Sequence, residues 1–88
     1  MLVIFAPICV EYIRALNIKP GQGIVGWVVE NSKPIRSGEV TQDPRYMSAR
    51  SGIRSELCVP LTIHDRTIGV IDIETARPNA YSEKDENL

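Results

Sequence analysis

Two strand-like segments joined by a short turn constrain the fold of this chain more than any other feature of it. Apolar side chains occupy every second position of Leu57–Ile63, and a second strand-like run covers Thr67–Glu74. His64–Arg66 between them has the composition of a turn. A period of two is typical of a strand with one buried face, and two such strands joined by a short turn form a β-hairpin. In the second strand this period places Asp72 on the same face as Val70.

A short helix and a further strand are expected before the hairpin. The pairs Ile24/Val28 and Val25/Val29 lie four positions apart, which gives a helix two apolar rows that face a core. Asn31–Pro34 should end this helix, because the residue before a proline avoids the α conformation. The following segment, 35–40, is typical of a strand that its glycine weakens.

The first ten residues are apolar throughout. They are too few for a membrane-spanning helix, which needs about 20 apolar residues. A signal peptide begins with a basic region, but the first basic residue here is Arg14. We therefore expect a buried strand over Met1–Val10, broken near Pro7. Glu11–Ile18 is expected to be a connector, in which the spacing of Tyr12 and Leu16 allows one helical turn.

Composition indicates one soluble globular domain. The 88 residues are 43% hydrophobic and 24% charged. Ten basic and eleven acidic residues give a net charge of −1, which removes the electrostatic argument for a nucleic acid or an anionic membrane as partner.

Cys9 and Cys58 each lie in an apolar stretch, which favours buried thiols in a reducing compartment, and the cytoplasm is the expected location. His64 is the one histidine, so no metal site is expected.

Two motifs have competing interpretations. Gly21–Gly26 matches the G-x-G-x-x-G pattern, but the strand before it and the long helix after it that dinucleotide binding requires are absent from the expected pattern, which favours a glycine-rich turn. The irregular segment Thr41–Ser55 carries three arginines. These arginines would form either an anion clamp or a set of solvated loop charges. Trp27 and Tyr46 would line a pocket or belong to the core.

Three stretches taken together resemble a GAF domain. In chain order they are Gly21–Val29, then Asp43–Tyr46 with Arg54–Leu61, and finally Ile68–Glu74 with Tyr81–Asp85. The resemblance implies an α+β fold related to the profilin-like and PAS folds, with an antiparallel sheet, flanking helices on one face, and a ligand pocket under loops on the other. It covers the C-terminal two-thirds of such a domain, so residues 1–88 are expected to be a single partial domain, truncated at both ends.

The same resemblance implies a small-molecule-sensing regulatory module of a cytoplasmic signal-transduction protein such as a sensor kinase, a cyclic-di-nucleotide enzyme or a transcriptional activator. Homodimers and an output domain in the full-length protein are part of this expectation, and the ligand is left unknown. A ligand-free dimerisation scaffold is the first alternative, and a GAF-type methionine sulfoxide reductase is the second. The side chains expected to line the pocket are Trp27, Arg36, Tyr46, Arg54, Glu56 and Cys58.

Comparison with the subfamilies leads to a non-enzymatic interpretation. GAF-type free methionine sulfoxide reductases have cysteines where Val25 and Ala49 stand, and aspartate where Arg50 stands. We therefore expect that this domain is not an enzyme. Of the cyclic-nucleotide signature, only the acidic pair Asp85–Glu86 is present. The resemblance also implies that the first strand of the family's fold lies before Met1. Without that strand, one edge of Met1–Val10 should have unpaired backbone groups, so we expect the 88 residues alone to be oligomeric, aggregation-prone or only partly folded.

Overall fold

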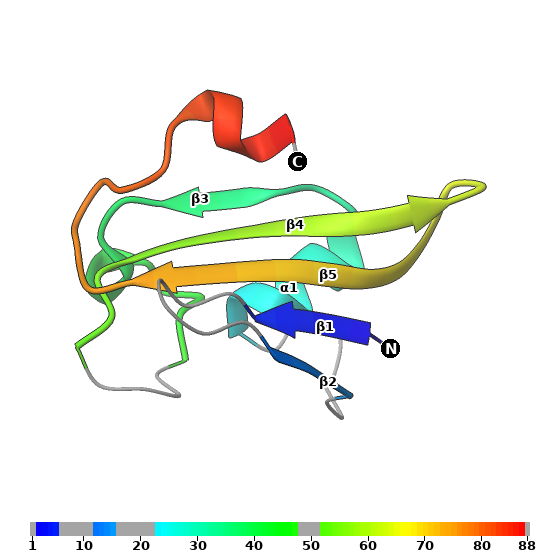
Figure 1. Cartoon of the computed structure of the whole chain (residues 1–88), viewed down its shortest axis with the longest axis horizontal. Helices are drawn as coiled ribbons and strands as arrows, with labels where there is room; N and C mark the ends of the chain where they lie inside the picture. Colours follow the sequence, from blue (N-terminus) through cyan, green and yellow to red (C-terminus); the bar gives the residue numbers. More distant parts are fainter. Residues whose placement is uncertain (1, 6–11, 16–22, 48–51, 88) are drawn as a thin grey trace.

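The computed structural model describes residues 2–5, 12–15, 23–47 and 52–87. Within these residues one sheet contains five strands in the order β2-β1-β5-β4-β3, shown in Figure 1. Neighbouring strands are antiparallel except for β1 and β5, which are parallel. The strands are β1 Leu2–Phe5, β2 Tyr12–Ala15, β3 Ile35–Ser37, β4 Ser55–Ile63 and β5 Arg66–Thr75, and the helical segments are α1 Gly23–Asn31, η1 Val40–Gln42 and η2 Glu83–Asn87. The expected α+β fold is confirmed.

The β4–β5 hairpin is the longest pairing of the sheet and confirms the hairpin prediction. Its strands begin and end slightly outside the predicted limits, because the ladder continues to the pair Ser55↔Thr75. At the turn, His64 and Asp65 both adopt positive φ, at 51° and 62°. This backbone matches the right-handed twist of two antiparallel strands. The hairpin therefore holds β4 and β5 in a fixed register.

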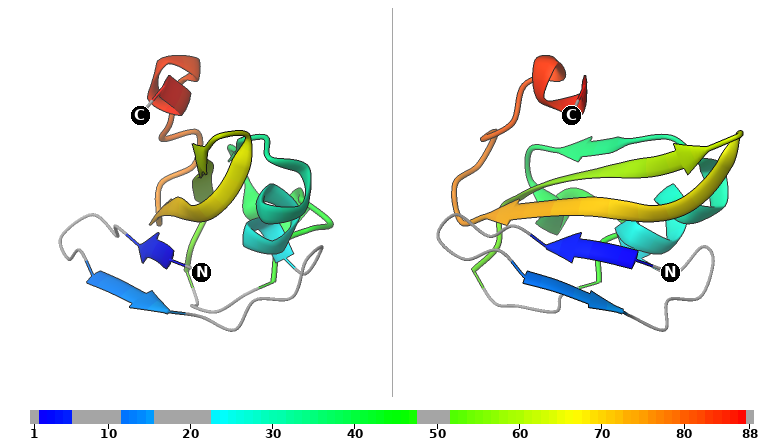
Figure 2. Two further views of the ribbon diagram at one scale, coloured as in Figure 1. Left: turned by 90° about the vertical axis from the view of Figure 1, so that its right-hand side faces the viewer. Right: turned by 45° about the vertical axis from the view of Figure 1, so that its right-hand side comes forward.

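Helix α1 covers one face of the sheet (Figure 2). Ile24 and Val28 are buried, and Val25 and Val29 pack against the same cluster, as the two apolar rows predicted. The helix ends where the sequence indicated: Ser32 has a φ of 54° and its backbone N–H donates to the carbonyl oxygen of Val28 at 2.8 Å. This left-handed residue satisfies a carbonyl at the C-terminus. The buried members of the cluster are Ile24, Val28, Ile35, Val40, Cys58 and Val70.

The short helix η2 lies on the face opposite α1. Ile35 of β3 belongs to the cluster under α1, so the next side chain, Arg36, points to the other face. There its Nε donates to Glu86 Oε2 of η2 at 3.0 Å. The resemblance implied helices on one face only, and the arrangement observed here divides them between the two faces (Figures 1 and 2).

The N-terminal expectations need two corrections. The connector expected at Glu11–Ile18 contains a strand, β2, because its residues pair with β1 over Leu2↔Ala15 to Phe5↔Tyr12. Tertiary pairing overrides the weak helical spacing. The expectation that one edge of the first strand has unpaired backbone groups is also wrong, since β1 pairs with β2 on one side and with β5 on the other. Residues 1 and 6–11 lie outside the described residues.

Strand β3 is shorter than the predicted 35–40. It ends at Ser37, and Val40 begins the 3-10 turn η1 instead. The reason is a change of partner: the backbone N–H of Val40 donates to the carbonyl oxygen of Arg54 at 2.7 Å, while the carbonyl oxygen of Gly38 accepts from Asn79 at 2.9 Å. The chain therefore leaves the β4 ladder at this point.

Candidate functional site

The register of three strands places polar side chains in rows beneath α1. Ser37 of β3, Glu56 of β4 and Glu74 of β5 face one another across the sheet. The adjacent row on the same face contains Cys58 and Asp72. Because side chains two apart on a strand share a face, Asp72 lies diagonally beside Glu56. The sheet thus brings three acidic residues to one face.

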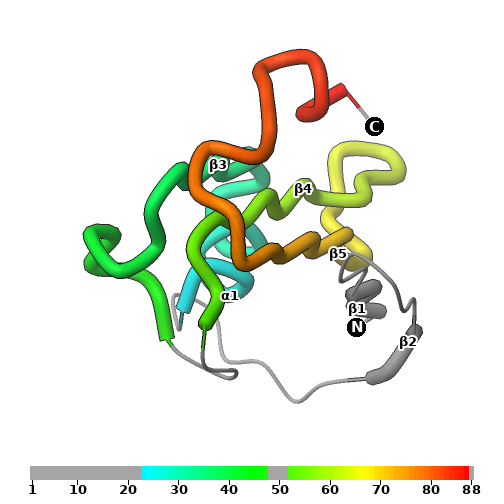
Figure 3. Tube along the Cα trace, turned by 60° about the vertical axis from the view of Figure 1, so that its left-hand side comes forward, coloured from blue at the N-terminus to red at the C-terminus, as the bar shows by residue number. Residues whose placement is uncertain are grey.

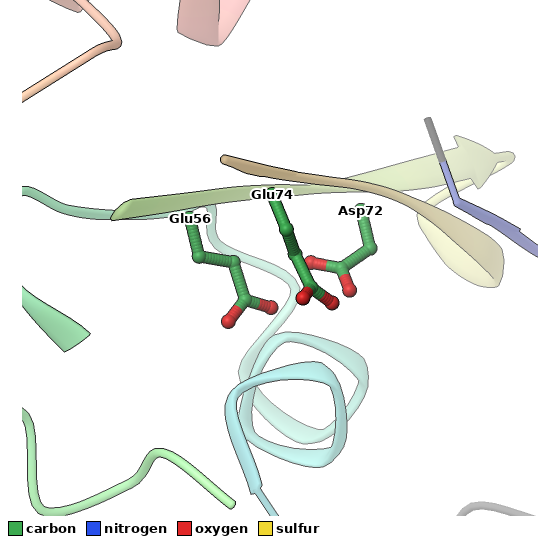
Figure 4. A group of neighbouring side chains, drawn as sticks. All are labelled: Glu56, Asp72 and Glu74. Atoms are coloured by element: carbon green, nitrogen blue, oxygen red, sulfur yellow. The ribbon is translucent and has the colours of Figure 1, made fainter. Parts of the chain in front are cut away.

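These three carboxylates form a compact buried cluster, which we call the acidic cluster: Glu56, Asp72 and Glu74. One oxygen of each lies within 4.8 Å of one oxygen of each of the others. Glu56 is 3% exposed, Asp72 1% and Glu74 8%. Figure 4 shows the three side chains leaving β4 and β5 on the side of α1, with their oxygens gathered between sheet and helix. Acidic side chains are rarely buried this deeply without a compensating partner.

Burial and mutual repulsion raise the pKa values of Asp72 and Glu56. Burial raises the pKa of Asp72 well above its ordinary range, and the hydrogen bond and negative charge of Glu56 raise it further. Burial likewise raises the pKa of Glu56, although the hydrogen bond with Asp72 opposes this effect. Among the described residues, Asp72 Oδ1 is a buried side-chain oxygen with no hydrogen-bond partner. A buried acceptor without a partner costs roughly 1–3 kcal/mol.

No described basic side chain neutralises the acidic cluster. The ion pairs in the described part of the chain join Arg36 to Glu86, Arg45 to Asp43, and Arg54 to Glu39. The cluster therefore has an excess of negative charge or holds protons, and a cationic or hydrogen-donating group would complete it.

A folded loop forms the rim beside the acidic cluster. Asp43 accepts hydrogen bonds from the backbone N–H and the Nε of Arg45, both at 2.9 Å, and from its Nη2 at 2.7 Å. The guanidinium of Arg45 lies 5.0 Å from the ring centroid of Trp27 on α1. Burial first, and to a lesser degree the negative charge of Asp43, raise the pKa of Glu56. Figure 3 shows this loop, in green, running from β3 toward the beginning of α1.

An open hollow of about 650 Å³ adjoins the same rim. Ser37 belongs to its lining and lies opposite Glu56 in the register of β3 and β4. The hollow therefore reaches the end of the row that contains two members of the acidic cluster. Its lining consists of Arg36, Ser37, Gly38, Glu39, Gln42, Asp43, Pro44, Arg45 and Asn79.

The structure brings four of the six sequence-predicted pocket residues to the α1 face. Glu56 belongs to the acidic cluster, and Cys58 is a fully buried member of the apolar cluster. Burial first, and then the negative charge of Asp72, raise the pKa of the Cys58 thiol. Trp27 and Tyr46 are half-buried and pack against the apolar cluster.

The two predicted arginines lie elsewhere. Arg36 faces η2 on the opposite side of the sheet. Arg54 is exposed, and its Nη2 donates to Glu39 Oε1 at 2.6 Å. The structure thus shows each guanidinium paired with a carboxylate of this chain. A role for either in ligand binding stays a prediction.

Sequence reasoning missed Asp72 and Glu74 as site residues. Both alternate with isoleucine in the return strand of the hairpin, and the sequence had already placed Asp72 on the face of Val70. The signal in the sequence was that Asp72 and Glu74 follow Val70 at alternate positions, so two acidic residues share a strand face with an apolar one. Only the pairing register shows that Glu56 joins them.

The chain belongs to the GAF domain family, whose model matches residues 6–88. It is 28% identical over 74 residues to GAF domain-containing protein A of Dictyostelium discoideum, covering 84% of this chain and 47% of that protein. Among solved structures, it is similar to type II free methionine-R-sulfoxide reductase of Thermoplasma acidophilum, with a TM-score of 0.75, 28% identity, and 80% of this chain and 50% of the other covered. The chain spans about half the length of the curated relatives it matches.

These similarities correct one expectation. Free methionine-R-sulfoxide reductase of Neisseria meningitidis, solved in complex with its substrate, matches 88% of this chain and 48% of its own with a TM-score of 0.77 and 26% identity. Such reductases are enzymes on this same fold, so the interpretation that the domain is not an enzyme does not stand. The absent cysteines were used to exclude the reductase activity, but they concern only one set of catalytic residues. The fold is shared with the reductases. Ala49 and Arg50 lie outside the described residues.

No helix within the described ranges is both long enough and apolar enough to span a membrane.

Proposed function

We propose that this GAF domain is the small-molecule-sensing module of a cytoplasmic signal-transduction protein. The ligand binds between α1 and the sheet, in contact with the acidic cluster and under the rim of Asp43–Tyr46. The observation that carries this proposal is Asp72 Oδ1, a buried acceptor without a partner among three gathered carboxylates. A buried polar group of this kind is satisfied when a ligand supplies the missing donor.

The chemistry of the acidic cluster defines the class of ligand. A carboxylate oxygen that carries no proton, such as the unpartnered Asp72 Oδ1, only accepts hydrogen bonds, so the group that it recognises donates a hydrogen bond or carries positive charge. The neighbouring apolar cluster, with Trp27 and Tyr46 at its margin, suits an apolar portion of the ligand. A small amphipathic molecule with a cationic end fits both surfaces.

The rim supplies a response to binding. Asp43 holds Arg45 within the loop, and Arg45 lies over the ring of Trp27, so a cation–π contact near the surface joins the loop to α1. Contacts of this strength are readily remade, and a ligand that prefers one loop arrangement shifts the population toward it. In a homodimeric full-length protein the shift would pass to an output domain.

Native mass spectrometry of the chain purified without chelators tests the proposal. We expect a fraction of the protein to carry an organic mass that is lost on mild activation. The Asp72→Asn variant should carry less of it, because its amide replaces one carboxylate oxygen with a donor. The Glu83→Gln variant on exposed η2 is the matched control and should retain it. A chain free of organic mass from every expression host and lysate tested would favour the ligand-free scaffold instead.

A further inference from the structure

We propose that the acidic cluster is a binding site for a hard divalent metal ion of the Mg²⁺, Mn²⁺ or Ca²⁺ class, held by Glu56, Asp72 and Glu74. The proposal rests on the proposed function only in that both use the same buried site. It differs in the group that completes the cluster, which here is an inorganic cation.

The spacing of the oxygens fits a common ion. Carboxylate oxygens lie about 2.0–2.6 Å from these metals, so two ligands of one ion are at most roughly 4–5 Å apart. The three oxygens of the acidic cluster lie within 4.8 Å of one another. They come from adjacent strands in a fixed antiparallel register, so a rigid element presents them together.

A second observation points to a missing partner. Asp72 is 1% exposed, and its Oδ1 has no hydrogen-bond partner among the described residues. Figure 4 shows the Asp72 carboxylate turned toward those of Glu56 and Glu74 and away from the strands. A cation bound through Asp72 Oδ1 would supply the missing partner.

The donor set selects the class of metal. The acidic cluster offers oxygen alone, which Mg²⁺, Ca²⁺ and Mn²⁺ prefer. Zinc favours nitrogen and sulfur, and the only histidine, His64, lies in the exposed turn between β4 and β5. Cys58 shares the face but belongs to the apolar cluster. Three carboxylates would also leave coordination positions open for water or for an oxygen of a bound molecule.

Metal binding to the whole 88-residue chain tests the proposal directly. After treatment with a chelator and its removal, Mn²⁺ is titrated and the free ion is followed by electron paramagnetic resonance, with Ca²⁺ and Mg²⁺ as competitors. We expect one site per chain. Glu74→Gln, which keeps the shape of the side chain, should weaken binding by roughly tenfold or more. The Glu83→Gln control on η2 should bind as the wild type does.

Thermal unfolding gives a second measurement. Since an ion that binds only the folded chain stabilises it by mass action, the melting temperature should rise with the logarithm of the Mn²⁺ concentration. This rise should be lost in Glu74→Gln, whose circular dichroism spectrum is compared with that of the wild type to confirm folding. If Glu74→Gln does not fold, Asp72→Asn takes its place in both measurements.

Two results would overturn the proposal. One is the absence of Mn²⁺ binding to the folded wild type at millimolar concentrations. The other is equal weakening in Glu74→Gln and Glu83→Gln, which would mean unspecific attraction to surface charge. An organic mass retained in the native spectrum while Mn²⁺ fails to bind would overturn the metal site alone and leave the proposed function standing. Metal binding without any organic mass would support the metal site and count against the small-molecule proposal.

Discussion

Glu56 of β4 lies directly opposite Glu74 of β5, and both carboxylates are buried on the face that α1 covers. Like charges at directly opposed positions destabilise a pair of strands, and burial adds a desolvation penalty. A fold that needed only stability would place apolar residues here, as it does at Val70 and Ile35 of the same face. The exception lies one pair from the open end of the hairpin, where β4 and β5 are still paired on both sides of it.

The first prediction concerns Asp72→Asn. The folded pKa of Asp72 is raised, so its favourable contribution is present below the unfolded value of about 3.9 and is lost as the pH rises through the folded value. Asparagine does not titrate. In chelator-containing buffer we therefore expect the variant to gain stability over the wild type as the pH rises, by about 1.4 kcal/mol for each unit by which the pKa is raised. Urea unfolding across the pH range measures this, and parallel pH profiles would contradict it.

The second prediction concerns the fastening of the rim loop. Arg45→Ala removes the ion pair with Asp43 and the cation–π contact with Trp27, and we expect a loss of about 1 kcal/mol because the Arg45 side chain is 37% exposed. Arg66→Ala, at an exposed position of the hairpin, is the control and should change the free energy of unfolding little. Guanidinium unfolding curves of both variants measure the free energy of unfolding. Equal losses of stability in the two variants would contradict a stabilising role of Arg45 in the rim loop.

The ion pair of Asp43 with Arg45 should weaken in acid. The hydrogen bond from Arg45 lowers the pKa of Asp43, so its contribution to stability is present above the unfolded value of about 3.9 and is lost as the pH falls through the folded value. We expect Arg45→Ala to remove this acid-side loss. NMR titration of the Asp43 carboxyl in both proteins measures it, and an unchanged titration midpoint would contradict the assignment.

The third prediction concerns Gly38 at the end of β3. A Cβ added there would collide with Oδ1 of Asn79, whose backbone N–H donates to the Gly38 carbonyl oxygen. Gly38→Ala should therefore cost roughly 0.5–1.5 kcal/mol, because the exposed Asn79 side chain must turn away from its rotamer. Asn79 has a φ of 51°, so adding Asn79→Gly removes the side chain while the backbone conformation is kept. We expect this second change to recover most of the loss in thermal unfolding. If the double variant remained as unstable as Gly38→Ala, the collision with the Asn79 side chain would not be the cause of the lost stability.

The fourth prediction concerns the buried thiol. Cys58 is fully buried, and burial together with the nearby carboxylates raises the pKa of its thiol, which disfavours the reactive thiolate. In a Cys9→Ser background we expect an alkylating reagent to modify Cys58 only at the rate of unfolding. Labelling in native buffer and in denaturant, followed by mass spectrometry, compares the two. Rapid modification of the folded chain would show that the site is open to solvent.

Local sequence determined the elements that carry strong periodic signals. The alternation of Leu57–Ile63, the turn at His64 and the apolar rows of Gly23–Asn31 each specify a structure through near neighbours, and the strand, the turn and the helix are observed. The burial of β4 does not alternate as predicted, because both faces are buried at Leu57–Val59 and the strand is exposed at Ile63. The GAF resemblance follows from the same stretches, and the family is shown. A period of two or of 3.6 fixes which side chains share a face, whatever the rest of the chain does.

Tertiary structure decided what depends on partners distant in sequence. Tyr12–Ala15 is a strand because β1 pairs with it, and β3 ends at Ser37 because Val40 and Gly38 bond to Arg54 and Asn79. The acidic cluster has the same origin: Glu56 lies far from Asp72 and Glu74 in sequence, and only the cross-strand register brings their oxygens within 4.8 Å. Sequence periodicity assigned each carboxylate to a face of its own strand, but burial under α1 and proximity to one another arise from packing, which local preferences do not encode.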